Sequence, residues 1–108
     1  MDVNIPFIEK IIHLIVSLVS PEQIILFGSY ARGDNSKKSD IDLLIIIKNL
    51  KNEREINNLL YNAFFDNEIN IPIDLISIDY EKYNKLSKEI GYVYKTVREQ
   101  GKVLYEAL

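Results

Sequence analysis

The chain has 108 residues, of which 47% are hydrophobic and 27% are charged, and its formal net charge is −3. This length supports a single hydrophobic core, so we expect residues 1–108 to form one domain. The acidic balance argues against a dedicated nucleic-acid-binding protein, although Arg32, Lys37 and Lys38 form a local basic patch.

Composition also limits which metal sites the chain can form and whether it can span a membrane. The chain has no cysteine and one histidine, which excludes disulfides, thiolate metal sites and histidine-rich zinc sites. A bound metal would therefore be a hard cation on oxygen ligands. The longest apolar stretch, 41–47, contains Asp42 and is far too short for a membrane span, and the N-terminus has no signal-peptide pattern. We therefore expect a cytoplasmic protein with no membrane partner.

Hydrophobic periodicity predicts alternating helices and strands. In the first segment, apolar residues recur at helical spacing, Pro6 suits the first turn and Ser20-Pro21 ends the pattern. In chain order we expect a helix over 4–19, a strand over 23–28, a helical turn over 29–33 capped by Ser29, a polar loop over 34–39, a strand over 42–47, a helix over 53–66, a strand over 73–78, a helix capped by Asp79 and running through Leu86, a helix over 91–100 and a short element over 102–105. This order predicts an α/β (α+β) domain with helices against a small sheet.

The dipeptide Gly28-Ser29 follows the first predicted strand. Glycine allows a tight turn and lets backbone amides approach a ligand closely. The amides of Ser29 and Tyr30 would then be unpaired donors at a helix start, where a phosphate is bound favourably, and the Ser29 hydroxyl would contact the same phosphate. The alternative is an ordinary strand end and helix cap, because Gly-Ser is among the commonest turn dipeptides.

Asp40 and Asp42 open the second apolar run and are separated by one residue. Alternation along a strand would place both carboxylates on one face. Placing two like charges so near each other costs free energy unless a cation lies between them. In proteins this cation is usually divalent. The alternative is that both are cap or turn residues. If strands 23–28 and 42–47 are neighbours, the Gly-Ser turn and the aspartate pair lie close together.

A third carboxylate, Asp74, lies early in the third predicted strand and would join the same edge of the sheet; the alternative is a lone buried or capping aspartate. Three carboxylates around two Mg²⁺ ions have a defined chemistry, because the metals neutralise a triphosphate, activate the attacking oxygen and stabilise the leaving pyrophosphate. Asp40 and Asp42 would contact both ions. Asp74 would hold the ion beside the nucleophile and accept its proton. The pattern indicates phosphoryl or nucleotidyl transfer.

The order Gly28-Ser29, ten residues, then Asp40-Ile41-Asp42 resembles the polymerase-beta-type nucleotidyltransferase superfamily. Within it, the segments 28–33 (Gly-Ser-Tyr-Ala-Arg-Gly) and 39–43 (Ser-Asp-Ile-Asp-Leu) resemble the minimal nucleotidyltransferases, which are short proteins usually encoded beside a HEPN-domain partner. Chain length, motif placement and the later Asp74 strand extend the resemblance over nearly the whole chain.

The resemblance implies a nucleotidyltransferase core with a small mixed sheet, ATP as the donor, Mg²⁺ as the cofactor and transfer of a nucleoside monophosphate to an acceptor hydroxyl. Arg32 lies in the matching motif and would contact phosphate or the acceptor; a salt bridge to Asp34 is the alternative. Matched position by position, the triphosphate would be held by Gly28 and Ser29, and the metals by Asp40, Asp42 and Asp74.

We therefore expect an ATP-dependent protein adenylyltransferase that acts as the antitoxin of a two-gene system, transferring AMP to a tyrosine of a HEPN ribonuclease toxin encoded nearby. The antitoxin role and the tyrosine acceptor rest on the resemblance alone. Two alternatives stay open: a non-catalytic antitoxin that acts by complex formation, and a transferase that acts on a small molecule or an RNA end. Because the chain ends about where a catalytic core would, we expect the acceptor to come from another protein or from a second copy.

Overall fold

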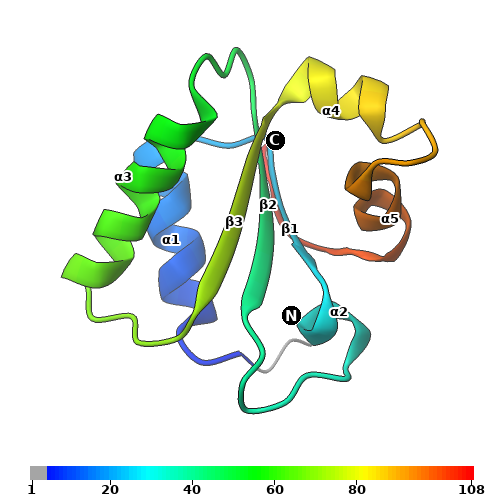
Figure 1. Cartoon of the computed structure of the whole chain (residues 1–108). Helices are drawn as coiled ribbons and strands as arrows, with labels where there is room; N and C mark the ends of the chain where they lie inside the picture. Colours follow the sequence, from blue (N-terminus) through cyan, green and yellow to red (C-terminus); the bar gives the residue numbers. More distant parts are fainter. Residues whose placement is uncertain (1–4) are drawn as a thin grey trace.

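The computed structural model describes residues 5–108, which contain five helices and four strands (Figure 1). In chain order these are α1 (Ile8–Val19), β1 (Gln23–Phe27), α2 (Ser29–Arg32), β2 (Ile41–Ile47), α3 (Glu53–Asp66), β3 (Ile73–Asp79), α4 (Tyr80–Leu86), α5 (Val93–Gln100) and β4 (Lys102–Glu106). The predicted α/β class is confirmed.

The four strands form one mixed sheet in the order β3-β2-β1-β4. β1 pairs antiparallel with β2 and with β4, whereas β2 and β3 run parallel. A parallel pair needs a crossover connection, which α3 supplies. The two strands that the site hypothesis required to be neighbours are therefore neighbours, and the short element predicted over 102–105 is an edge strand.

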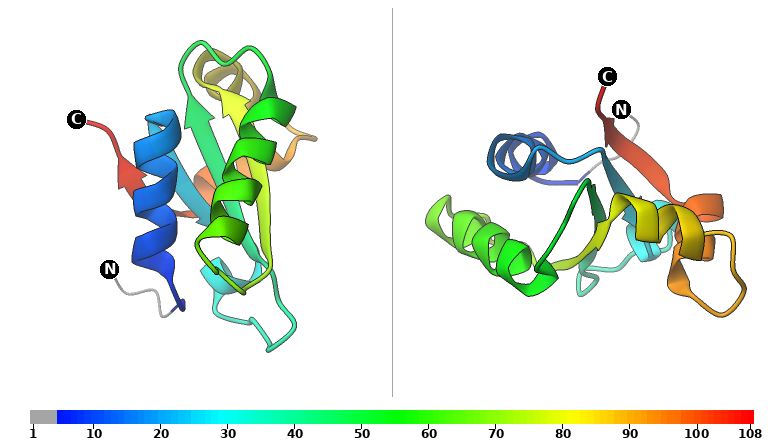
Figure 2. Two further views of the ribbon diagram at one scale, coloured as in Figure 1. Left: turned by 90° about the vertical axis from the view of Figure 1, so that its left-hand side faces the viewer. Right: turned by 90° about the horizontal axis from the view of Figure 1, so that it is seen from above.

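Helices cover both faces of the sheet, as the unbroken apolar strands predict. α1 and α3 lie on one face, α4 and α5 lie on the other, and α2 lies at the end of the sheet where β1 stops (Figures 1 and 2). Within residues 5–108, none of the helices combines the length and the apolar character that crossing a membrane would require.

Successive residues of the central strand β2 enter two separate parts of the core. Leu43 and Ile45 belong to the larger cluster, which includes residues of α1 and α3. Leu44 and Ile46 belong to the smaller cluster, which includes Val97 of α5 and residues of α4. This alternation fixes which face of the sheet each residue of β2 occupies.

The main boundary error in the sequence prediction concerns α1. The helix begins at Ile8 and not at residue 4, which itself lies outside the described residues. Pro6 and Phe7 form a turn, and Phe7 has a positive φ of 64° that is incompatible with a right-handed helix. A proline that is acceptable in a first helical turn is equally acceptable in the turn before it.

Asp79 caps α4, as predicted. Its carboxylate accepts hydrogen bonds from the backbone N–H groups of Glu81 and Lys82 at 3.1 and 3.4 Å. It also accepts one at 3.1 Å from the N–H of Leu50, in the segment between β2 and α3. The carboxylate therefore joins the start of α4 to the loop that leaves β2.

Gly101 ends α5 where the helix comes closest to β1. Its backbone is extended, with φ −73°, so its conformation does not require glycine. A Cβ there would lie 2.5 Å from the Val97 carbonyl oxygen and 2.6 Å from Cγ2 of Ile25. Lack of space is what requires glycine, and it allows α5 to end directly against the sheet.

Candidate active site

The antiparallel pairing of β1 and β2 brings the Gly28 turn beside the aspartates. Phe27, the last residue of β1, is paired with Asp42, the second residue of β2. Gly28 follows with φ 75° and ψ −155°, a conformation that essentially only glycine adopts. The chain turns there from β1 into α2, at the end of the sheet where β2 begins (Figure 1).

Gly28 lies directly against the Asp42 side chain. A Cβ at position 28 would overlap Oδ2 of Asp42 and would lie 3.0 Å from its Cγ. Glycine is therefore required twice at this position, by its backbone conformation and by the carboxylate that fills the space a side chain would need. The Gly-Ser turn and the Asp42 carboxylate are therefore in direct contact in the structure.

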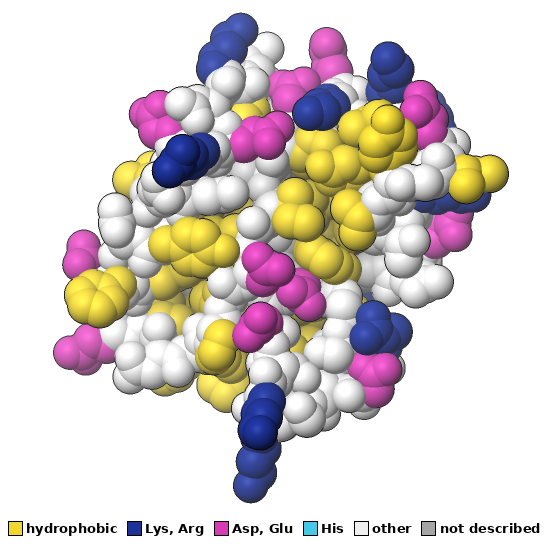
Figure 3. Space-filling view, in the orientation of Figure 1, with side chains coloured by type: hydrophobic (Ala, Val, Ile, Leu, Met, Phe, Trp, Pro, Cys, Tyr) yellow, Lys and Arg dark blue, Asp and Glu magenta, His cyan; other side chains and the backbone are white. Residues whose placement is uncertain are grey.

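The parallel pairing of β2 and β3 brings Asp74 to the same end of the sheet. Asp42 is aligned with Asp74 in the register, and Asp40 directly precedes β2. Asp42 alternates in phase with Leu44, and Asp74 with Ile76, so both carboxylates belong to the face covered by α4 and α5. Figure 3 shows acidic side chains gathered at the centre of one face of the molecule, beside apolar side chains.

The three carboxylates affect one another electrostatically. Burial raises the pKa of Asp42 above its ordinary value, and the negative charges of Asp74 and then of Asp40 raise it further. The positive charge of Arg32 opposes this shift of the pKa. The ionised form of Asp42 is therefore less favourable than that of a free aspartate.

Ser29 is the first residue of α2, so the prediction that its side chain caps this helix was wrong. The N-cap position is Gly28, which has no side chain and makes no side-chain cap hydrogen bond. The Ser29 carbonyl oxygen accepts hydrogen bonds from the N–H groups of Gly33 and Asp34, at 2.9 and 3.1 Å. Gly33, with φ 83°, closes this single turn.

Arg32 forms the salt bridge that was the alternative to phosphate contact. Its Nε lies 3.2 Å from Oδ2 of Asp34. Both side chains are more than half exposed, at 53% and 62%, so the pair contributes little stability and can be opened at low cost. Arg32 therefore keeps a positive charge close enough to lower the pKa of Asp42, although its side chain is not fixed in the core.

Oxygen donors in this arrangement fit a hard divalent cation. Asp40, Asp42 and Asp74 supply carboxylates only, and the raised pKa of Asp42 shows negative charge that a cation would neutralise. Within residues 5–108, no three acidic or histidine side chains already stand close enough together to enclose a metal ion. The donor chemistry fits, and ion binding would have to draw the carboxylates together.

One feature beside this site was not predicted from the sequence. An apolar pocket of about 280 Å³ adjoins Gly28 and Arg32 and is lined on its other side by α5. The α5 residues that line it are Val93, Thr96, Val97 and Gln100. Their spacing is that of one helix face, a signal that was present in the sequence, but nothing there indicated that this face would meet the Gly28 turn.

Comparison with known families confirms the class of enzyme. Residues 8–104 match the model of the nucleotidyltransferase domain family. The chain belongs to this family. Its members generally use a nucleoside triphosphate and a divalent metal, which agrees with the oxygen-rich site at the end of the sheet.

The relatives include three proteins of Methanocaldococcus jannaschii, each named "Putative protein adenylyltransferase". One is 34% identical over 92 residues, which cover 78% of this chain and 78% of the relative. The others are 50% identical over 34 residues and 64% identical over 31 residues, covering 32% and 29% of this chain. These two matches span only about a third and a fifth of the relatives' lengths, 34% and 21%.

Two solved structures share the fold. A crystal structure described as a putative nucleotidyltransferase from Sulfolobus solfataricus has a TM-score of 0.60 and 24% identity, and the match covers 91% of this chain and 76% of that one. A structure described as a toxin-antitoxin with AMP-PNP has a TM-score of 0.56 and 24% identity, with 93% and 74% covered. The mixed sheet with helices on both faces is thus a known nucleotidyltransferase architecture.

The contact between Gly28 and Asp42 makes a specific prediction for stability. Gly28→Ala should lower the free energy of unfolding by about 2–4 kcal/mol, because it combines a glycine-only conformation with steric overlap. The control is Gly33→Ala, where φ is also positive but a Cβ would meet nothing within 4 Å; we expect about 1–2 kcal/mol there. Urea denaturation measures both. Equal losses in the two variants would contradict the close packing of Gly28 on Asp42.

The raised pKa of Asp42 predicts that Asp42→Asn stabilises the protein to an extent that depends on pH. A carboxyl group whose pKa is raised in the folded protein contributes stability that is fully present below its ordinary pKa. This contribution is lost as the pH rises through the higher pKa of the folded protein. In metal-free buffer, Asn should therefore raise the melting temperature by a few degrees at neutral pH and by much less at pH ~3.5. The control Asp66→Asn changes an exposed aspartate at the end of α3. A gain that is the same at both pH values would argue against charge as its cause.

Proposed function

We propose that this chain is an ATP- and Mg²⁺-dependent nucleotidyltransferase that transfers AMP to a tyrosine hydroxyl of a HEPN ribonuclease toxin and thereby acts as its antitoxin. The observation that supports it most is that Gly28 packs on Asp42 while Asp74 is aligned with Asp42 across the sheet. The Gly-Ser turn and a set of acidic groups thus meet at one end of the sheet.

The ligands of the two Mg²⁺ ions in this proposal are Asp40, Asp42 and Asp74. When bound, the ions supply charge neutralisation for the triphosphate and for the pyrophosphate that leaves. Burial is the main cause of the raised pKa of Asp42, and the carboxylates in turn lose the mutual repulsion that raises it further. Binding of Mg²⁺ with ATP therefore also stabilises the fold.

Gly28 and Ser29 hold the triphosphate in this proposal. With no side chain at position 28, the backbone and the Ser29 hydroxyl can approach a phosphate beside Asp42. Arg32 would exchange its exposed contact with Asp34 for a phosphate oxygen. An anion with several negative charges competes well against one exposed carboxylate, so this exchange is favourable.

The acceptor hydroxyl attacks the α-phosphorus of ATP. A new oxygen–phosphorus bond forms, the bond from the α-phosphorus to the bridging oxygen of the β-phosphate breaks, and pyrophosphate leaves. Asp74 takes the hydroxyl proton as general base. It suits this role because it is exposed on β3, an edge strand of the sheet, where an acceptor can reach it.

A protein acceptor and a toxin partner are supported by the comparisons. The relatives carry the name "Putative protein adenylyltransferase", and a structure of the same fold is described as a toxin-antitoxin with AMP-PNP. The exposed carboxylate edge leaves room for a partner to present a side chain. The HEPN class of the partner and the tyrosine acceptor follow from the resemblance of the Gly28–Asp42 motif to the minimal nucleotidyltransferases.

The test is transfer of label from ATP, marked at its α-phosphate, to the protein encoded by the neighbouring gene, which this proposal expects to be a HEPN-domain ribonuclease. We expect Mg²⁺-dependent labelling that is lost when the acceptor tyrosine is changed to Phe. An Asp40→Asn, Asp42→Asn double variant should label at least about a hundredfold more slowly, since the metals supply several kcal/mol of charge stabilisation. Asp66→Asn is the matched control and should label normally.

No label with the unmodified chain, or equal labelling by the double variant, would contradict the proposal. The non-catalytic alternative has its own signature in the same experiment. If the double variant neutralises the ribonuclease as well as the unmodified chain does, complex formation alone is responsible and AMP transfer is not the antitoxin activity.

A further inference from the structure

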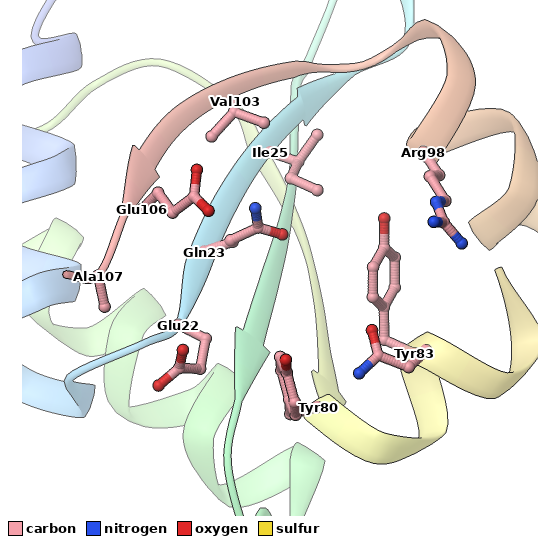
Figure 4. A pocket seen from close by; sticks show the side chains of 10 residues that line it. Glu22, Gln23, Ile25, Tyr80, Tyr83, Arg98, Val103, Glu106 and Ala107 are labelled. Carbon is pink, nitrogen blue, oxygen red and sulfur yellow. The ribbon is translucent and has the colours of Figure 1, made fainter.

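Two pockets in the described residues differ in their relation to the candidate active site. The more polar one, of about 340 Å³, lies on the same face of the sheet but at the start of β1, and none of the proposed site residues lines it. Figure 4 shows Glu22 and Glu106 at one side of this pocket. Arg98 lies at the other side, beyond Tyr83. The second is the apolar pocket beside Gly28.

The apolar pocket is continuous with the proposed triphosphate site. Gly28 and Arg32, which hold the triphosphate in the proposed function, are also part of its wall. Phe27 lines it from β1, and it alternates in phase with Ile25, so the pocket opens on the same face of the sheet as Asp42. A ligand bound at the Gly28 turn therefore has an apolar cavity immediately beside it.

The pocket has the composition of a site for a weakly polar group. Val93 and Val97 present apolar surface from α5, and Gly101 brings the end of that helix close to β1. Thr96 and Gln100, one helical turn apart, add a hydroxyl and an amide at the exposed side. An apolar pocket with a few hydrogen-bonding groups is the usual form of a small-ligand site.

We infer that this pocket receives the adenine base of the donor nucleotide. The inference rests on the proposed function, which places the triphosphate at Gly28. The order of the strands separates the two substrates: Asp74 on β3, where the acceptor loses its proton, lies on one side of Asp42, and the pocket lies on the other side, next to β1. The acceptor side chain and the base therefore approach from opposite sides of the triphosphate.

The experiment compares the binding of ATP and of inorganic tripolyphosphate, each with Mg²⁺, by calorimetry. Thr96→Trp fills the pocket from an exposed position, and Glu99→Trp places the same ring elsewhere on α5. We expect Thr96→Trp to weaken ATP binding at least tenfold while tripolyphosphate binding changes less than twofold. Glu99→Trp should leave both unchanged. Val93→Phe, at another partly exposed lining residue, repeats the test in a second variant.

Three results would overturn the inference. ATP affinity that is unchanged in both filling variants shows that the base lies elsewhere. Equal loss of ATP and tripolyphosphate shows that the pocket only supports the Gly28 turn. Retained ATP affinity with lost AMP transfer shows that the pocket takes the acceptor. Failure of the proposed function is distinct, because it appears in the unmodified chain itself, either as no binding of ATP and tripolyphosphate or as no transfer of AMP.

Discussion

The register between β1 and β2 is the constraint on which the candidate site depends. Because Phe27 is paired with Asp42, the residue that follows β1 must pass directly against the Asp42 carboxylate, and only glycine leaves room there. The parallel register of β2 with β3 then aligns Asp74 with Asp42. Two independent strand pairings, one antiparallel and one parallel, thus bring residues from three separate parts of the chain to one end of the sheet.

The rest of the fold holds this register in place. β2 is the most buried strand, with apolar residues entering the core on both faces, and α3 makes the crossover that allows β3 to run parallel to it. At the site itself the arrangement is unfavourable: a half-buried carboxylate has its pKa raised by burial and by two neighbouring charges. A well-packed sheet can maintain such an unfavourable local arrangement, and shifted pKa values of this kind cluster at functional sites.

Much of this could be predicted from the sequence, and the failures have physical causes. Periodicity placed α3 at its observed bounds because its apolar residues recur at helical spacing, and the strand positions followed from their apolar runs. The contact between Gly28 and Asp42 could not be predicted, since strands that are apolar on both faces carry no alternation to fix their register. The side-chain cap assigned to Ser29 was wrong because the glycine before it takes the cap position. The apolar pocket depends on how α5 meets α2, a long-range contact that local patterns do not encode.

In the proposed function, the Gly28 turn and the three carboxylates form one site for a cation and a nucleotide. Paramagnetic broadening by Mn²⁺ in the presence of a non-hydrolysable ATP analogue tests this most directly, with backbone amide signals of the isotope-labelled protein as the readout. We expect the amides of Gly28, Asp42 and Asp74 to broaden first, and an Asp40→Asn, Asp42→Asn variant to lose this pattern. Broadening centred on other carboxylates, such as Glu22 and Glu106 at the opposite end of β1 and β4, would contradict it.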